Sequence, residues 1–392
     1  MSWPLVQIGK YADKVRTWNP AAGEECIFQY VDLSSVDKSR KVIDLDNVAE
    51  ISSAEAPSRA RQLVVAGDVL VATVRPNLNG VAVVPAELNG ATASTGYCVL
   101  RADEKNLHGR YLFHWVQTGS FVEDMMSKPT GANYPAVSDK IVKESKIPLP
   151  PLPEQKRIAA ILDKADAIRR KRQQAIQLAD DFLRAVFLDM FGDPVTNPKG
   201  WDTCKFEALT SLVTYGLTVR PEYHEEGIPL ISAREIRTGE LDFESCPKIS
   251  RSDFDALSEK GRPKKDDILF SKTGSIGHCA IVKSELDFAV TQNAARIVPN
   301  KEVCDPIFLL AFMRTNYFYD LANKEAKGNA VKDLQLGIMK DFPMYIPPIS
   351  LQKKFVDVYS KASLLSEKVS GGSILLNSNF GALSQAAFSG QL

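Results

Sequence analysis

The chain has 392 residues, of which 44% are hydrophobic and 24% charged, values that predict a folded protein of two or three domains. Its 48 basic and 48 acidic residues give a formal net charge of zero, which argues against a protein that coats nucleic acid through bulk charge but allows a local basic face. No apolar run approaches the roughly 18 residues of a membrane span, and no signal peptide is visible, so we expect a cytoplasmic protein with no membrane partner.

The sequence lacks the motifs of several catalytic classes. It has no P-loop, no HExxH, no GxSxG and no Asn-Pro-Pro-aromatic tetrad of amino-methyltransferases. The six cysteines never form CxxC and the four histidines do not cluster, so we expect neither a disulfide framework nor a metal site. We therefore predict no catalytic residue and no cofactor in this chain, and we expect that any chemistry belongs to a partner.

The expected elements follow the same order twice along the chain. In the first half we expect short strands at 63–65, 69–72, 81–84 and 97–100, followed by a helix at 110–123. A proline-rich hinge comes next, and Pro153 suits the first turn of a long helix that we expect to extend to Phe191. In the second half we expect strands at 268–270, 280–282 and 295–298, a helix at 307–322, and a long helix from Phe355.

An internal repeat explains this order. The hinge around Pro151 recurs around Pro348, which is 197 positions further on. Nearly the same offset separates Trp3 from Trp201, Thr118 from Thr315, Gly131 from Gly328 and Phe191 from Phe388. We therefore predict a tandem duplication with boundaries at 1–147, 148–193, 194–344 and 345–392, in which a globular part alternates with a helical part.

Both long helices carry an apolar seam with alternating spacings of three and four residues, which is typical of a helix that packs along a partner helix. We expect the two seams to be buried against each other. Within the second helix, Gly371 and Gly372 disfavour helix and predict a kink or a fray. The seam residues that we expect to pair the helices or to meet a partner are Ile158, Leu162, Ile168, Leu183, Phe355, Leu365 and Leu383.

Over essentially its whole length the chain resembles the specificity subunits of type I DNA restriction–modification systems. The resemblance rests on the PLPPLPEQKRI segment from Pro148 to Ile158, on Thr130-Gly131-Ala132, on Gly67-Asp68-Val69-Leu70 and on AFSGQL from Ala387 to Leu392. It implies an α+β fold with two tandem α/β target recognition domains, separated by two long helices that form an antiparallel coiled coil with pseudo-two-fold symmetry. The second copy departs from the family pattern at Ser350 and at the two glycines.

The resemblance also implies a function. Each recognition domain would read one half of a bipartite, non-palindromic site in double-stranded DNA. Two methyltransferase subunits and two restriction subunits would assemble on the chain and carry out adenine-N6 methylation or ATP-dependent cleavage, using S-adenosylmethionine, ATP and Mg. The chain itself would be a non-catalytic subunit.

Side chains that read base edges are commonly Arg, Lys, Asn and Gln, whereas Lys and Arg on phosphates position a protein on DNA. Loops that follow predicted strands supply candidates for base reading: Arg75, Asn77 and Asn79 in the first copy, and Lys272, Thr273 and Ser275 in the second. Candidates for phosphate contacts are Arg59, Arg61, Arg220, Arg234, Lys264 and Lys265.

Two other functions stay open at this point. The tandem units could form a scaffold that binds only proteins, or the chain could be an enzyme whose site is too irregular to recognise. Binding to a bipartite DNA site in the presence of a methyltransferase subunit would exclude the scaffold. Methylation or cleavage by the purified chain alone would favour the enzyme.

Overall fold

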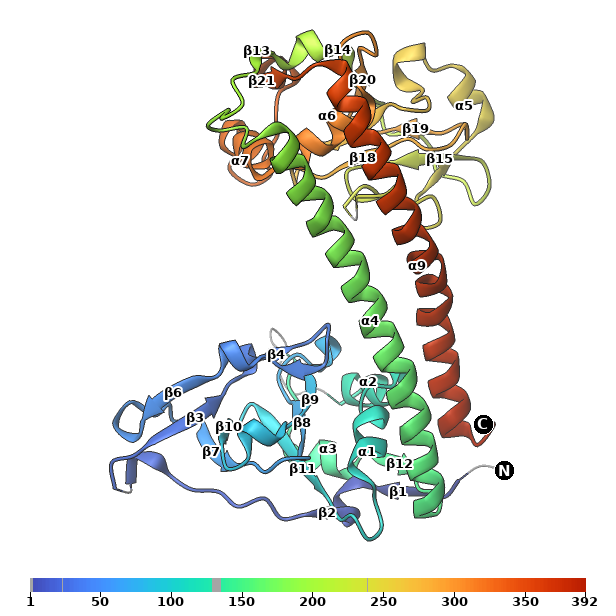
Figure 1. Cartoon of the computed structure of the whole chain (residues 1–392). Coiled ribbons are helices and arrows are strands. Elements are labelled where there is room, and N and C mark those ends of the chain that lie inside the picture. Colours follow the sequence, from blue (N-terminus) through green and yellow to red (C-terminus); the bar gives the residue numbers. More distant parts are fainter. Residues whose placement is uncertain (1–2, 23, 129–134, 238) are drawn as a thin grey trace. The chain divides into compact units, whose positions relative to one another are not determined.

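The computed structural model describes residues 3–22, 24–128, 135–237 and 239–392, and for 370–379 it describes the backbone only. The chain divides into two compact units. Unit 1 consists of Met1–Gln174 together with Val369–Leu392, and unit 2 is the continuous segment Ala175–Lys368. The division therefore cuts both long helices, α4 (Leu152–Phe191) and α9 (Ile349–Ser389), near their middles (Figure 1).

Unit 1 contains a four-stranded sheet with the order β2-β11-β8-β9 and a second with the order β6-β3-β10-β7. In the first sheet every pairing is antiparallel, and all residues of the central strand β8 are buried. In the second sheet β10 runs parallel to β3 and antiparallel to β7. The strands are β2 (Ala12–Asp13), β3 (Ile27–Val31), β6 (Ala49–Ser52), β7 (Ala60–Leu63), β8 (Val69–Ala72), β9 (Val81–Val83), β10 (Thr92–Ser94) and β11 (Tyr97–Ala102).

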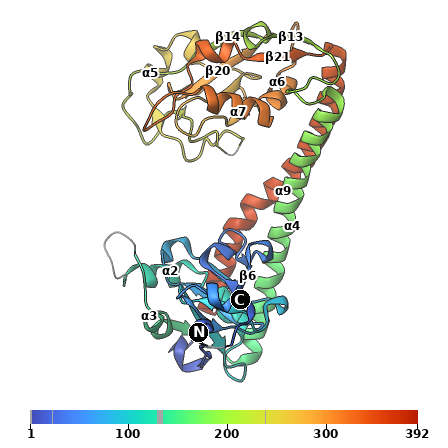
Figure 2. The ribbon, with the colours of Figure 1, turned by 90° about the vertical axis from the view of Figure 1, so that its left-hand side faces the viewer.

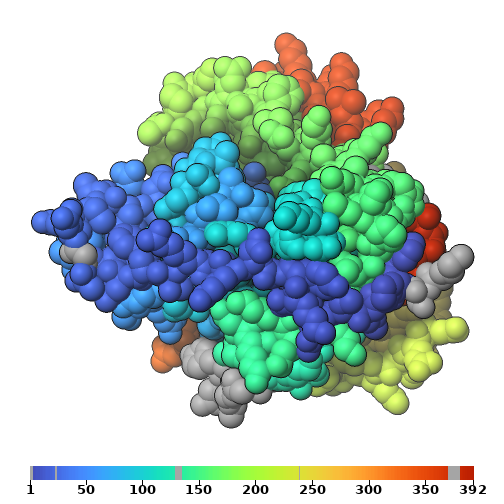
Figure 3. Space-filling view, turned by 90° about the horizontal axis from the view of Figure 1, so that it is seen from below, coloured from blue at the N-terminus to red at the C-terminus, as the bar shows by residue number. Residues whose placement is uncertain are grey.

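Three short helices and the first turns of α4 cover the first sheet of unit 1. The helices are α1 (Gly109–Trp115), α2 (Gly119–Met126) and α3 (Asp139–Glu144). Beside them β1 (Leu5–Gln7) pairs antiparallel with β12 (Lys146–Pro148), immediately before α4. In the space-filling view from below, the N-terminal segment (dark blue) crosses the face of unit 1 beside the green atoms of α4 (Figure 3). A hairpin of β4 (Val36–Asp37) and β5 (Val42–Ile43) completes the unit.

Unit 2 repeats most of the elements of unit 1 in the same order. Its sheets have the orders β14-β20-β17-β18, β16-β15-β19 and β13-β21. Helices α6 and α7 cover one face of the first sheet (Figure 2), where Phe308, Phe312 and Phe318 pack against Phe270 and Ile297. The elements are β13 (Asp202–Lys205), β14 (Thr210–Tyr215), β15 (Ile228–Ile231), β16 (Lys248–Ile249), β17 (Ile268–Ser271), β18 (Cys279–Ile281), β19 (Ala289–Val290), β20 (Ala294–Pro299), β21 (Pro343–Ile346), α5 (Arg251–Asp255), α6 (Pro306–Met313), α7 (Asn316–Glu325) and α8 (Leu336–Lys340).

The predicted strands at 69–72, 81–84, 97–100, 268–270, 280–282 and 295–298 are confirmed within one or two residues at each end. The strand predicted at 63–65 is displaced, since β7 ends at Leu63. The single helices predicted at 110–123 and 307–322 are wrong, because each is divided into two. The division falls at Thr118 and Thr315. The Thr118 hydroxyl accepts a hydrogen bond from the Phe121 amide, and the Thr315 hydroxyl accepts one from the Phe318 amide, so each threonine caps the start of a new helix.

The repeat is present at the level of individual contacts. Gln155 and Gln352 are fully buried, and each side chain donates to the carbonyl five residues earlier, that of Pro150 or Pro347, at 2.9 Å. Each also accepts a backbone amide from the segment that precedes α1 or α6. In the sheets, Arg101 pairs with buried Asp68 at 2.8 Å and Arg296 pairs with buried Asp267 at 2.6 Å.

The ends of the long helices pack into the unit that contains them. In unit 1, Ile158 and Leu162 near the start of α4 lie in one core cluster with Phe388 near the end of α9. In unit 2, Phe187 and Phe191 near the end of α4 contact Phe355 near the start of α9, with ring centroids 5.6 and 5.5 Å apart. Of the predicted seam residues, Ile158, Leu162 and Phe355 are buried in these clusters.

The middle of each seam differs from the prediction. Ile168 is 40% exposed and Leu365 is 65% exposed, so the prediction that these two side chains are buried between the helices is wrong. Spacing identifies an apolar stripe but not the surface that covers it. Leu183 and Leu383 are partly buried. Helix α9 continues through Gly371 and Gly372, so the predicted fray is also not observed.

Candidate nucleic-acid interface

The predicted reading loop of unit 1 is held at both ends. It contains a short 3-10 turn, Pro76–Leu78, and the flanking Arg75 and Asn79 have positive φ angles of 52° and 44°. Such angles are uncommon for residues other than glycine and persist where the surroundings fix them. Here the Asn79 carbonyl accepts the Lys41 ammonium at 2.5 Å, and the Asn79 side chain donates to the Gln117 carbonyl.

A hollow of about 260 Å³ lies beside this loop. Arg75, which lines the hollow, and Asn77 in the same loop are exposed. The lining thus combines apolar side chains with two cations, a combination that suits a base edge beside a phosphate. The lining residues are Leu33, Lys38, Ala72, Val74, Arg75, Leu78 and Gly80.

The turn between β10 and β11 borders the same end of the unit. The Thr73 hydroxyl donates to the Gly96 carbonyl at 2.9 Å, and the Arg59 carbonyl accepts the Thr95 amide at 2.8 Å. The structure thus brings the exposed Arg59 to the region of the reading loop, by way of this turn. Arg61 is half-buried and donates to the carbonyl of its neighbour Ala60.

In unit 2 the predicted Lys272 and Thr273 meet a second loop. Both side chains bond to the Asp333 carboxylate, and the Lys272 nitrogen lies 5.9 Å from the centre of the Tyr215 ring. Burial by itself would raise the pKa of Asp333, but the bonds from Lys272 and Thr273 lower it. Lys272 is only 9% exposed and its charge is compensated by Asp333, so it fits a role in joining two loops better than a role in base reading.

A turn that carries Gln292 and Asn293, two residues that the sequence did not indicate, meets this loop through the backbone of Asn293. The backbone amide of Lys272 donates to the Asn293 carbonyl at 3.1 Å, and the amide of Gln292 donates to the Leu217 carbonyl at 2.9 Å. The side chains of Gln292 and Asn293 are exposed, and such amides can make two hydrogen bonds to adenine. They stand in the turn before β20, which is the counterpart of the turn with Gly96 in unit 1.

Other predicted residues are distributed over unit 2. Arg220 is exposed and its guanidinium lies 5.2 Å from the centre of the Tyr223 ring. Arg234 is exposed in the turn that begins at Ser232. Lys264 pairs with Glu259 at 3.0 Å. Because Lys264 and Lys265 precede β17 whereas Lys272, Thr273 and Ser275 follow it, the structure does not bring these two groups together.

The described residues of the candidate interface offer polar and cationic groups. Among them, no group of three or more His, Cys, Asp or Glu side chains could hold a metal ion. Within the same ranges, no helix is both long and apolar enough to span a membrane. Burial raises the pKa of the thiols of Cys98, Cys279 and Cys304, so these cysteines remain protonated and unreactive.

Comparison with known families agrees with a role in recognition. The model of the type I restriction modification DNA specificity domain matches residues 65–178 and 215–367, and the chain belongs to this family. The chain is therefore a DNA specificity subunit, the non-catalytic member of a type I system, in which partner subunits carry out catalysis. This confirms the resemblance seen in the sequence.

Individual relatives are distant in sequence. The specificity subunit of the type I restriction enzyme EcoBI from Escherichia coli is 22% identical over 325 residues, which cover 75% of this chain and 68% of the relative. The corresponding subunit of EcoKI from E. coli K12 is 23% identical over 326 residues, covering 76% and 68%. The solved S subunit from M. genitalium shares the fold, with a TM-score of 0.61, 14% identity, and coverage of 99% of this chain and 96% of that one.

Proposed function

We propose that unit 1 and unit 2 read different halves of a bipartite, non-palindromic DNA site. The observation that carries this proposal is that the candidate loops follow equivalent strands, β8 and β17, but differ in their exposed side chains. After β8 unit 1 presents Arg75 and Asn77, whereas after β17 unit 2 presents Ser275. The turns before β11 and β20 differ as well, since unit 2 has exposed Gln292 and Asn293 where unit 1 has Thr95 and Gly96. Because base recognition depends on the side chains that meet base edges, equivalent loops with different residues should read different sequences.

We further propose that α4 and α9 form an antiparallel coiled coil that relates the units by a pseudo-two-fold axis. The start of α4 packs with the end of α9 in unit 1, and the end of α4 packs with the start of α9 in unit 2. These contacts support opposite helix directions. The coil would set the number of unread base pairs between the two half-sites.

Partner subunits would cover the exposed apolar side chains of the long helices. Ile168, Leu178 and Phe182 on α4 are 40%, 60% and 51% exposed, and Leu364 and Leu365 on α9 are 54% and 65% exposed. Apolar residues gathered on an exposed surface mark interaction sites. We assign them to two methyltransferase subunits, which would use S-adenosylmethionine for adenine-N6 methylation. Two restriction subunits would add cleavage driven by ATP and Mg.

An exchange of one reader tests the proposal. Residues 1–147 would be replaced by those of another specificity subunit, and methylated motifs would be mapped in cells that also contain the methyltransferase subunit. We expect one half of the motif to change and the other half to persist. If both halves changed, the assignment of one half-site to each unit would be wrong. If no motif depended on this gene, the protein-only scaffold would be favoured.

A further inference from the structure

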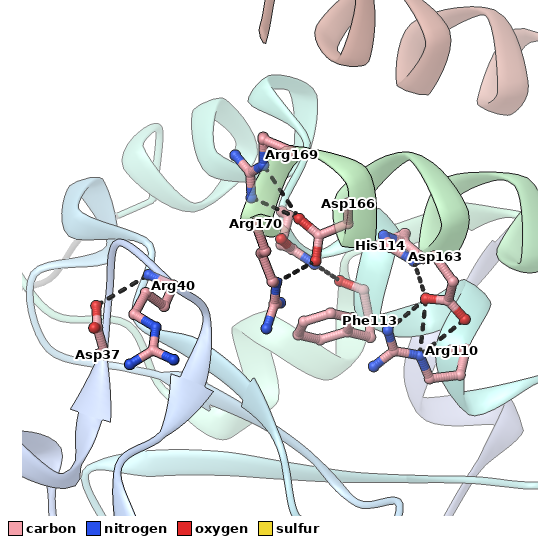
Figure 4. Close-up of polar contacts among 10 residues, drawn as sticks. Asp37, Arg40, Arg110, Phe113, His114, Asp163, Asp166, Arg169 and Arg170 are labelled. Atoms are coloured by element: carbon pink, nitrogen blue, oxygen red, sulfur yellow. Dashed lines mark hydrogen bonds and ion pairs between the residues drawn. The ribbon is translucent and has the colours of Figure 1, made fainter. Parts of the chain in front are cut away.

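Five cations gather in unit 1 on two elements that none of the candidate reading residues occupies. They are Lys38, Arg40 and Lys41 in the β4–β5 hairpin, and Arg169 and Arg170 in α4; we call them the cationic cluster. Figure 4 shows Arg40 on the hairpin, and Arg169 and Arg170 on α4 on either side of Asp166. The Lys41 ammonium donates to the Asn79 carbonyl, which fixes the hairpin beside the reading loop, and burial and then the charge of Arg169 lower the pKa of Lys41.

Among the described residues, two carboxylates contact these two elements close to the five cations, and both carboxylates already have hydrogen-bond partners. Asp37 accepts the amides of Ser39 and Arg40 within its own turn. Asp166 is 6% exposed and binds both arginines of α4, Arg169 at 2.7 Å and Arg170 at 2.7 Å. The cluster thus keeps a net positive charge.

Asp166 orients the two arginines differently. Arg169 donates two hydrogen bonds to Asp166, and its guanidinium lies 5.2 Å from the centre of the Phe380 ring. Its main role is therefore to connect α4 with α9. Arg170 donates only its Nε group to Asp166. A guanidinium has five N–H groups, so Arg170 retains a fork of donors whose direction Asp166 fixes. Such a fork matches the geometry of a phosphate.

The corresponding position of unit 2 has the opposite charge. The residue 197 positions after Arg170 is Glu367, which pairs with Lys283 at 2.8 Å. Lys283 also pairs with Glu240. The repeat therefore folds with an acidic residue in place of Arg170, so the architecture does not require an arginine at this position.

We propose that the cationic cluster binds the phosphates of the DNA backbone beside the half-site that unit 1 reads. The Lys41 ammonium donates to the Asn79 carbonyl of the reading loop, so the cluster adjoins the surface assigned to base reading. This inference rests on the proposed function and adds to it an element, α4, that grips DNA without reading its sequence. Contacts with phosphates position a protein and supply salt-dependent affinity that is independent of sequence.

The test uses the complex of the full chain with its methyltransferase subunits. The triple variant Lys38→Gln, Arg40→Gln and Arg170→Gln would be compared with wild type by measuring Kd at several salt concentrations. One duplex carries the mapped motif and a second of equal length lacks it. We expect affinity for both duplexes to fall in the same proportion, and the slope of log Kd against log salt to decrease by about 0.9 for each lost phosphate contact. The methylated motif should not change.

Two further variants keep the test decisive. Lys38→Gln with Arg40→Gln alters only exposed side chains of the hairpin and should reduce the slope by a smaller amount. The matched control is Arg157→Gln, which removes an exposed arginine of α4 that pairs with Glu154 outside the cluster, and it should behave as wild type.

A triple variant with the wild-type slope and affinity would overturn the inference. A triple variant that no longer assembles with the methyltransferase subunit would overturn it in favour of an acidic protein surface. A wild-type complex that binds both duplexes equally would contradict the proposed function itself, and the inference with it. These three outcomes are distinguishable in the same set of measurements.

Discussion

Asp163 links helix α4 to two side chains of helix α1, His114 and Arg110 (Figure 4). His114, whose side chain is 2% exposed, contacts the carboxylate through Nε2 at 2.7 Å, and Arg110 pairs with the same group. Burial alone would raise the pKa of Asp163, but the bonds from His114 and Arg110 outweigh it and hold the pKa at about 2. The carboxylate is therefore charged wherever the chain is folded at moderate pH.

This shift predicts a pH-dependent contribution to stability. Because the pKa in the folded chain lies below the ordinary value of 3.8, the charged carboxylate stabilises the fold above pH 3.8, and this contribution is lost as the pH falls through about 2. Allowing for solvent screening, Asp163→Asn should cost about 1 kcal/mol at pH 7 and progressively less below pH 4. Urea unfolding of wild type and Asp163→Asn from pH 7 to below pH 4 would measure this difference in the free energy of unfolding.

A control and a contradictory result are available for Asp163. Asp341→Asn removes an exposed pair with Lys205 and should cost less than about 0.5 kcal/mol at pH 7. If the difference between wild type and Asp163→Asn stayed constant down to pH 2, the carboxylate would not be the titrating group.

The buried glutamine of unit 2 predicts a larger effect. Gln352 bonds to the amide of Asp305 and to the carbonyls of Val303 and Pro347. Gln352→Ala leaves these backbone groups without partners in a buried site, so we expect a loss of about 3 kcal/mol. Gln177→Ala, which alters an exposed glutamine of α4, should cost less than about 0.5 kcal/mol. Equal melting temperatures for the two variants would contradict this reading of Gln352.

At the scale of elements, α4 and α9 combine buried ends with exposed middles. We therefore expect Ile168→Glu with Leu365→Glu to leave the free energy of unfolding within about 0.5 kcal/mol of wild type while weakening the methyltransferase complex. Phe355→Ala instead creates a cavity among aromatic rings and should cost about 3–5 kcal/mol. Thermal melts measure the first quantity, and co-purification with the partner measures the second.

Either of two results would contradict this assignment of the helix surfaces. A large loss of stability in the double glutamate variant would mean that its side chains are buried after all. An undiminished complex would mean that the partner binds elsewhere.

The sequence predicted elements better than it predicted contacts between them. The repeat could be predicted because the same residues recur at a fixed offset. The strand β8 could be predicted because the Gly67-Asp68 turn and the apolar run that follows it form a pattern of neighbouring positions. Heptad spacing identified Ile158 and Ile168 alike, although only Ile158 is covered by a core. Burial depends on which surface arrives from elsewhere in the chain, and spacing carries no information about that.

The candidate interface was predicted only in part, for the same reason. Arg75 and Asn77 followed from their position after a strand. Gln292 and Asn293 were missed because they reach the Lys272 loop only through pairing of distant strands. Lys272 itself was assigned to base reading because its partner, Asp333, lies 61 positions away in sequence.

At the scale of the whole molecule, the proposed coil predicts how the DNA site can be altered. Seven residues inserted after Ala175, with a matching insertion near Ser373, keep both seams in phase. Each helix then lengthens by about 10 Å, since a helix rises 1.5 Å per residue. Mapping of methylated motifs should show both half-sites unchanged and a gap longer by up to about three base pairs, at about 3.4 Å per pair.

The single insertion in α4 serves as the control for this experiment. Because it breaks the match between the two helices, we expect it to abolish methylation or to leave it weak. An active complex of the double insertion that retains the original gap would mean that the helices do not set the spacing.

The two segments of unit 1 are synthesised at separate times, one before and one after unit 2. The Phe388 ring packs 5.0 Å from Tyr111 and 5.1 Å from Trp115, yet it is synthesised after the whole of unit 2. At translation rates of about 5–20 residues per second, the nascent first reader waits roughly 10–40 s with this apolar surface uncovered. Unit 2, a continuous segment, meets no such delay. The reader that is translated first is therefore the last to finish folding, and a chain interrupted before α9 ends should leave an incomplete first reader for chaperones and proteases.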